Sequence, residues 1–129
     1  MARKLSEYVL MNINSSGGNA SKNSVKYRVA LPNTWMQQMG INDANRSVEV
    51  LFNGRELIIQ MPTDIEYPGY EKNIATISIT GSGGGASKNT LRYNIFFLNR
   101  WIQQLNVTDD SRTFKRSFID GKIILEKVT

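Results

Sequence analysis

Residues 15–41 read SSGGNASKNSVKYRVALPNTWMQQMGI, and residues 81–107 read GSGGGASKNTLRYNIFFLNRWIQQLNV. The second stretch repeats the first after 66 positions without a gap. Ser-Lys-Asn occurs in both, and a tyrosine, a tryptophan and a Gln-Gln pair follow it at the same spacing. Because chance does not produce so long a match, the chain is predicted to be a tandem duplication of one unit.

The repeat also predicts the domain organisation. Residues 1–61 form the first unit and residues 75–129 the second, and residues 62–74 contain two prolines and a glycine, which is typical of a connection. Two copies are too few for an open stack of repeats, so they are expected to pair about a pseudo-twofold axis. At 129 residues, two separate units would have very small cores, so the copies are expected to form one domain.

Each unit is expected to begin with two strands. Residues 8–13 and 74–79 are rich in β-forming residues and end in loops of glycine and serine. After the first loop, apolar residues alternate with polar ones over residues 25–31. This period of two predicts a strand with one buried face, whose basic side chains Lys26 and Arg28 point outward.

A short helix is expected after the second strand. Pro32 suits a first helical turn, and Gly40 suits a C-terminal cap. In the second copy Asn106 stands where Gly40 stood, and asparagine is the next best residue for a left-handed cap. Trp35 and Trp101 lie on the apolar stripes of these helices, so they are expected to pack in the core and not to stack on bases.

A hairpin is expected to end each unit. Its strands are residues 47–52 and 57–61 in the first copy and residues 113–119 and 122–127 in the second. They turn at Asn53-Gly54 and at Asp120-Gly121, which are dipeptides typical of tight hairpins. Each unit is therefore predicted to be β-β-α-β-β, and the chain to be mainly β with two short helices.

Composition argues against an enzyme. The sequence has no cysteine and no histidine, which removes disulfides, thiolate nucleophiles, imidazole bases and the usual zinc ligands, so no metal or cofactor is expected. The acidic residues Asp43, Asp109 and Asp110 follow the predicted helices, where turn formation explains them. The chain has neither a long apolar span nor a secretory signal, so a cytoplasmic protein without a membrane partner is expected.

Charge points to a polyanionic partner. The 16 basic and 11 acidic residues give a formal net charge of +5. Residues 1–61 hold seven basic and four acidic residues, and residues 75–129 hold eight and four, so both copies carry the excess. Neutralising phosphates releases counterions and raises affinity for nucleic acid. The same charge would also keep a small protein soluble, so charge alone leaves both interpretations open.

The two glycine-rich loops carry Lys22-Asn23 and Lys88-Asn89. Glycine lets backbone N–H groups approach an anion closely, and nearby lysine and asparagine side chains suit phosphate oxygens. The spacing is not that of a nucleotide-binding P-loop. The alternative is a flexible hairpin tip that is kept polar for solubility.

The order of these elements resembles the AbrB/MazE/SpoVT family of DNA-binding domains. The resemblance is carried by RVALP (residues 28–32), MGI (residues 39–41) and SVEVLFNGRELIIQ (residues 47–60), and more weakly by residues 75–127. Members of this family form dimers in which two copies interleave hairpins into one barrel. The resemblance therefore implies a single-chain, pseudo-dimeric, swapped-hairpin barrel, in which Arg28 occupies the place of a DNA-contacting arginine.

The leading hypothesis is a transcriptional regulator that binds duplex DNA. Its expected DNA-binding residues lie in the loops and the basic strands, and they are Lys22, Asn23, Lys26, Arg28, Lys88, Asn89 and Arg92. Second-rank candidates follow the helices or lie in the last hairpin, and they are Arg46, Arg112, Lys115 and Arg116.

The alternative is a protein-binding module, such as the antitoxin partner of a toxin. The second copy replaces the outward Arg28 and Ala30 with Asn94 and Phe96, so its outer face is more apolar. That face and the C-terminal tail would contact the partner. Further association of two such chains is compatible with either function.

Overall fold

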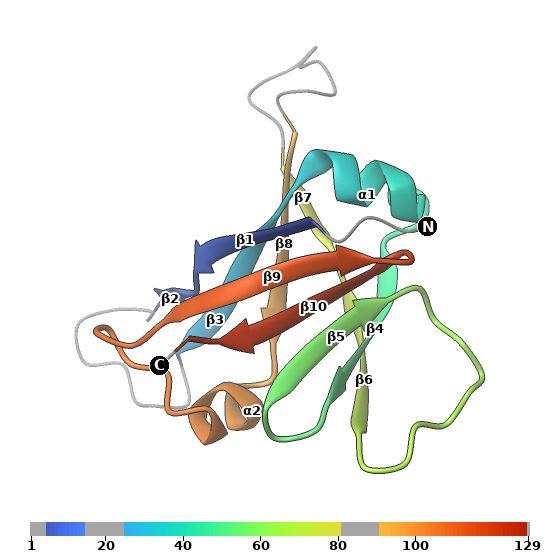
Figure 1. Ribbon diagram of the computed structural model, residues 1–129. Coiled ribbons are helices and arrows are strands. Elements are labelled where there is room, and N and C mark those ends of the chain that lie inside the picture. Colours follow the sequence, from blue (N-terminus) through green and yellow to red (C-terminus); the bar gives the residue numbers. More distant parts are fainter. Residues whose placement is uncertain (1–4, 15–24, 81–90, 129) are drawn as a thin grey trace.

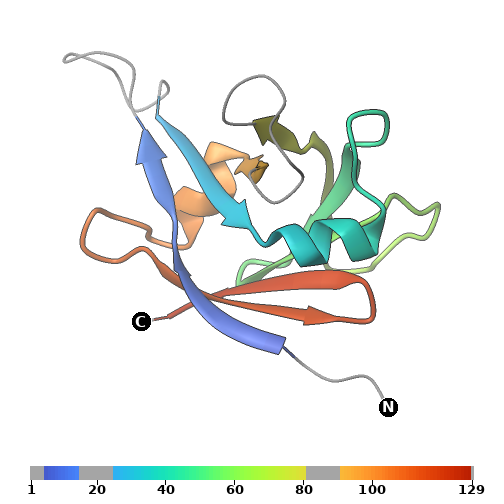
Figure 2. The ribbon, with the colours of Figure 1, turned by 90° about the horizontal axis from the view of Figure 1, so that it is seen from above.

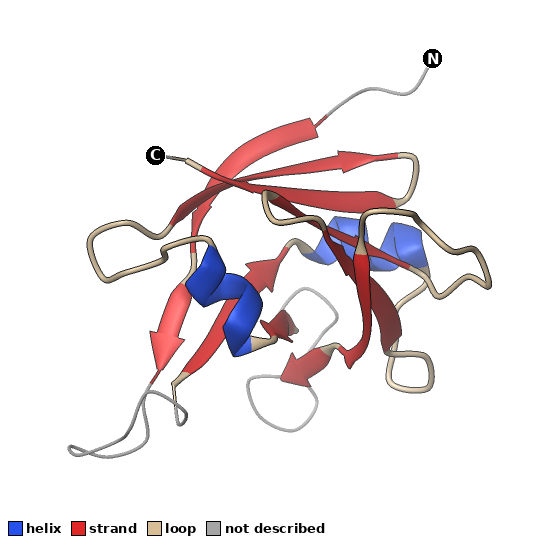
Figure 3. Ribbon diagram, turned by 90° about the horizontal axis from the view of Figure 1, so that it is seen from below, coloured by secondary structure: helices blue, strands red, loops and turns tan. Residues whose placement is uncertain are grey.

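The structure is a computed structural model that describes residues 5–14, 25–80 and 91–128 (Figure 1). Its elements are β1 (Leu5–Leu10), β2 (Asn12–Asn14), β3 (Lys26–Leu31), α1 (Asn33–Met39), β4 (Ser47–Phe52), β5 (Glu56–Gln60), β6 (Glu71–Thr76), β7 (Ser78–Thr80), β8 (Arg92–Phe97), α2 (Asn99–Gln104), β9 (Thr113–Ile119) and β10 (Lys122–Lys127). The protein is mainly β with two short helices, as predicted. The helices lie at opposite ends of the sheets (Figures 1 and 3). Within the described ranges, no helix has the length and apolarity needed to cross a membrane.

The strands form two antiparallel sheets. One has six strands in the order β1-β9-β10-β5-β4-β6, and the other has four in the order β2-β3-β8-β7. The single closed barrel expected from the family resemblance is wrong for the described strands, because neither sheet closes. Closure requires the edge strands of a sheet to hydrogen-bond to each other. Here the edge strands β1 and β6 continue instead into β2 and β7 of the other sheet.

Each predicted first strand is split by a buried residue. Met11 separates β1 from β2, and Ile77 separates β6 from β7, and both side chains are fully buried. The N–H of Met11 donates to the carbonyl of Arg112, and the N–H of Ile77 donates to the carbonyl of Arg46, each at 2.8 Å. Figure 2 shows the first ribbon curving from β9 to β3. The unit is therefore β-β-β-α-β-β, and β6 begins inside the predicted connection.

The two copies exchange strand partners. β1 pairs with β9 and β6 pairs with β4, while β5 pairs with β10 and β3 with β8. Residues that the repeat makes equivalent face each other in both sheets, with Val29 opposite Ile95 and Ile58 opposite Ile124. An approximate twofold axis therefore passes through the centres of both sheets.

The core between the sheets is shared by the two copies. Trp35 stacks on Phe118, and Trp101 stacks on Phe52, each with ring centroids 5.2 Å apart. Each tryptophan thus packs against the phenylalanine of the other copy. Trp35 and Trp101 are 4% and 1% exposed, which confirms that both belong to the core.

Both helices end in left-handed backbone, as predicted. Gly40 follows α1 with φ of +81°, and Asn106 lies just beyond α2 with φ of +61°. Only glycine, and less often asparagine or aspartate, adopts this conformation at low energetic cost.

Replacing Gly40 with alanine is expected to lower the free energy of unfolding by about 1–2 kcal/mol, the cost of a left-handed backbone for a residue with a Cβ atom. A Cβ atom at Gly40 would have no described atom within 4 Å, so the loss would come from the backbone alone. The matched variant Asn106→Gly should keep or slightly raise stability. Urea unfolding of the three proteins tests this, and equal stability of Gly40→Ala and the parent would contradict it.

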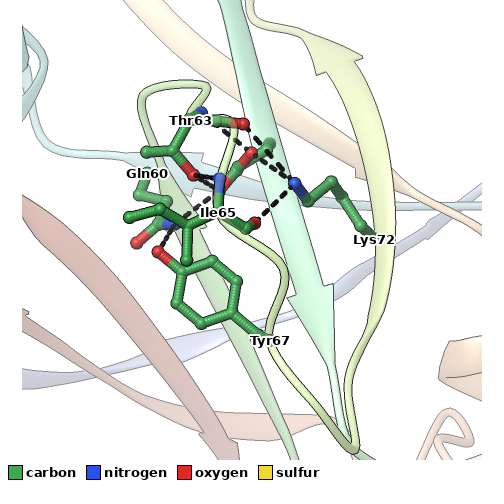
Figure 4. Close-up of polar contacts among 6 residues, drawn as sticks. Gln60, Thr63, Ile65, Tyr67 and Lys72 are labelled. Carbon is green, nitrogen blue, oxygen red and sulfur yellow. Dashed lines mark hydrogen bonds and ion pairs between the residues drawn. The ribbon is translucent and has the colours of Figure 1, made fainter.

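Polar contacts that include Gln60, Thr63 and Lys72 hold the connection between the copies (Figure 4). Glu49 lies on the outward side of β4, yet its side chain is fully buried because the connection covers it. Its carboxylate accepts hydrogen bonds from Gln60 Nε2 at 2.5 Å and from the N–H and hydroxyl of Thr63 at 3.0 Å each. Lys72 Nζ lies 3.4 Å from Glu49 Oε1. Burial by itself raises the pKa of Glu49, but the hydrogen bonds from Gln60 and Thr63, with that from Lys72, outweigh it, so the pKa is lowered.

Candidate nucleic-acid interface

The outward side of the four-stranded sheet carries three of the predicted basic residues. In β3 and β8 buried and accessible residues alternate, so Lys26, Arg28 and Arg92 point away from the core, as predicted for β3. The cross-strand partners on this side come from β2 and β7. We call this surface the basic face, and it consists of Asn12, Lys26, Arg28, Ala30, Ser78, Thr80, Arg92, Asn94 and Phe96.

The described strands of this sheet contain basic residues and no acidic residue. In the sequence, residues 12–31 and 78–97 contain five basic and no acidic residues. Three of the five, Lys26, Arg28 and Arg92, lie in the described strands, and Lys22 and Lys88 lie outside the described residues. The remainder of the chain holds equal numbers of basic and acidic residues. A positive potential over one surface attracts polyanions and speeds their association.

A groove lies on the part of the basic face around Arg28 and Arg92. Its volume is about 630 Å³, and the side chains that line it include Arg28, Arg92, Asn12, Asn94 and Thr80. Guanidinium, amide and hydroxyl groups are the side-chain donors that proteins use for phosphate oxygens. No acidic residue lines this groove within the described part of the chain.

Arg28 lies at the centre of the basic face and has an unpaired donor. Its Nε atom is buried and lacks a hydrogen-bond partner among the described residues. A buried donor without a partner costs about 1–3 kcal/mol. An oxygen of a bound anion would satisfy this N–H only after the guanidinium group turns toward the groove, and pairing it would remove this cost.

The approximate twofold axis relates unequal positions on this face. Lys26 is equivalent to Arg92, so a cation stands at each end, whereas Arg28 is equivalent to Asn94. In the register of β3 and β8, Lys26 and Arg92 are separated by six residues along the strand direction. At about 3.3 Å per residue, this separation is roughly 20 Å. That span corresponds to about six base-pair steps at 3.4 Å per step.

Several predicted site residues are not part of the basic face. Lys22, Asn23, Lys88 and Asn89 lie outside the described residues.

Arg46 and Arg112 precede β4 and β9, where their carbonyls accept the hydrogen bonds from Ile77 and Met11. The guanidinium Nη1 of Arg112 also donates to the carbonyl of Met11 at 3.0 Å. Arg112 therefore stabilises the strand bend and does not point into the groove, and Arg46, although exposed, is not among the groove residues.

Arg116, a second-rank candidate, makes several contacts within the protein. Its Nε donates to Glu7 at 2.7 Å, its Nη1 donates to the carbonyl of Ala30, and its Cζ lies 5.7 Å from the centre of the Trp35 ring. These contacts hold β1, β3 and β9 together. Arg116 was predicted to contact phosphate, but in the structure its guanidinium group stabilises the packing of these three strands.

Residues from β2 and β7 were missed by the sequence reasoning. Asn12 and Thr80 line the groove because each predicted first strand is split and its second part joins the four-stranded sheet. No local pattern marks such a split, although the buried Met11 and Ile77 occupy equivalent positions in the two copies.

Comparison with known proteins adds no relative: no family model, no curated protein and no solved structure matches this chain.

Proposed function

We propose that this protein binds duplex DNA through the basic face and acts as a transcriptional regulator. The observation that carries the proposal is the presence of three cations, Lys26, Arg28 and Arg92, on the outward side of a sheet whose described strands contain no acidic residue. Duplex DNA carries one negative charge per about 1.7 Å of helix axis, and phosphate contacts supply much of the affinity in such complexes. This function would place the protein in the cytoplasm.

The strand exchange supports an arrangement like that of the AbrB/MazE/SpoVT family. In this proposal the two copies act as a pseudo-dimer within one chain, since each first strand pairs with the hairpin of the other copy. Symmetry of the protein surface is mirrored in the two halves of a DNA site. Because Arg28 is replaced by Asn94 in the second copy, the two half-sites would be unequal.

Replacing both Arg28 and Arg92 with alanine is expected to weaken DNA binding roughly 100-fold, since each lost hydrogen bond to a charged group is worth about 1.5 kcal/mol or more. The dependence of log K on log salt should become shallower by about 1.8, which is 0.9 for each phosphate contact. Fluorescence anisotropy with a mixed-sequence duplex, from about 50 to 200 mM salt, measures both quantities.

The matched control removes the same charge elsewhere. Arg55 and Lys122 are exposed on the β4-β5 and β9-β10 hairpins, away from the basic face. The Arg55→Ala/Lys122→Ala variant should keep most of the affinity and the slope. Equal losses in the two double variants would mean that binding depends on net charge alone, and the proposed interface would then be wrong.

A further inference from the structure

One aromatic side chain lies in the middle of the basic face. Phe96 points outward from β8 and is 40% exposed, although most residues of this face are polar or cationic. Arg28 is its direct partner across the strands. Cross-strand partners have Cβ atoms about 4.5–5.5 Å apart, so the ring and the guanidinium group share one small area of surface.

A hollow beside the Phe96 ring is lined in part by a second cation, Lys26. It has a volume of about 210 Å³ and is lined by Lys26, Tyr27, Phe96, Phe97 and Asn99. The side chain of Asn99 is held at the rim, because its Nδ2 donates to the carbonyl of Val25 at 2.6 Å. The hollow therefore combines an aromatic surface, an ammonium group and a fixed amide.

We propose that Phe96 is a stacking platform for an unpaired nucleic-acid base, with Arg28 and Lys26 holding the flanking phosphates. This inference rests on the proposed function and adds a second form of nucleic acid that the same face would bind, which is a strand with accessible bases. Aromatic side chains between basic ones are the usual means by which proteins bind single strands, since every base has a π-face.

The charge around Phe96 favours a nucleotide over an apolar protein segment. The buried centres of protein–protein interfaces are depleted of lysine and acidic residues, although arginine and aromatic residues are enriched there. Phe96 instead lies beside Arg28 and Lys26, on a sheet without acidic residues. A protein partner would have to bury both cations, whereas a nucleotide brings its own phosphates.

The stacking platform belongs to one copy only. The position equivalent to Phe96 in the first copy is Ala30, which is also on the basic face. The axis therefore relates a site with a ring to a site without one. One chain would hold one stacked base.

The experiment compares Phe96→Ala, Phe96→Leu and the parent on a single strand and on the duplex of the same sequence, by anisotropy at fixed salt. Phe96→Ala should weaken single-strand binding about 5- to 150-fold, the range for one stacked base, and leave duplex binding within twofold. Phe96→Leu should lose nearly as much, because leucine keeps the apolar contact but not the ring. Quenching of a fluorescent adenine analogue in the single strand should disappear in both variants.

Other outcomes overturn the proposal in different ways. Unchanged single-strand affinity in Phe96→Ala would exclude stacking and leave the ring as a contact for a protein partner. Full affinity in Phe96→Leu would show that only apolar contact matters. The Arg28→Ala/Arg92→Ala variant separates the two proposals, because duplex binding that survives it contradicts the proposed function, whatever the effect of Phe96.

Discussion

Trp101→Ala is expected to lower the free energy of unfolding by about 3–5 kcal/mol, the usual cost of truncating a buried aromatic side chain. The indole is 1% exposed and stacks on Phe52 of the other copy. Its Nε1 also donates to Glu71 at 3.1 Å, so the variant removes a hydrogen bond to β6 as well. Since whole domains are stable by about 5–15 kcal/mol, a large share of the total would be lost.

Urea unfolding followed by circular dichroism measures this loss. Trp35→Ala is the matched variant, because Trp35 stacks on Phe118 with the same centroid distance. The two losses should be similar if the two copies contribute equally to one cooperative core. Two separate unfolding transitions, each sensitive to only one of the variants, would contradict a shared core.

Glu49→Gln is expected to lower the free energy of unfolding by about 2–3 kcal/mol at neutral pH, because a buried donor without a partner costs about 1–3 kcal/mol. The carboxylate accepts hydrogen bonds from Gln60 and from both donors of Thr63. A glutamine would place its own N–H₂ group against these donors. The connection would then detach more easily from the outward side of β4.

The loss should depend on pH in a defined direction. Hydrogen bonding lowers the pKa of Glu49 in the folded protein below its ordinary value of 4.5. A lowered pKa means that its contribution to stability is complete above the pKa of the unfolded state and is lost as the pH falls through that of the folded state. The difference in stability between the parent and Glu49→Gln should therefore be constant near neutral pH and shrink below about pH 4.5.

Glu126→Gln is the control for this series. Glu126 lies on the outward side of β10 and is exposed. Its replacement should change stability by less than about 0.5 kcal/mol at any pH, as is usual for surface substitutions. A difference for Glu49→Gln that stays constant down to low pH would show that the carboxylate charge does not hold the connection.

The secondary structure of the last part of each unit could be predicted from local sequence. β4, β9 and β10 have the predicted bounds, and β5 differs by one residue at each end. Their signals are local, since alternating apolar residues and the Asn-Gly and Asp-Gly turns act within a few residues. The same holds for the left-handed residues Gly40 and Asn106, which depend on backbone sterics alone.

The candidate site could also be predicted in part from local sequence. The alternation in residues 25–31 determines which side chains of β3 share a face, so the outward direction of Lys26 and Arg28 follows from local sequence. Alternation does not determine which strands become neighbours. The addition of Asn12 and Thr80 to the groove, and of Phe96 opposite Arg28, follows from pairing between residues far apart in the chain.

The sequence by itself thus determined the duplication, the types of most elements and the outward direction of the basic residues. Only the tertiary structure decided that the first strands bend at Met11 and Ile77, that the sheets stay open, and that Glu49 is buried. The physical reason is the range of the forces involved. Propensity and periodicity act between neighbours in sequence. The pairing of a strand and the burial of Glu49 depend instead on contacts between residues far apart in the chain.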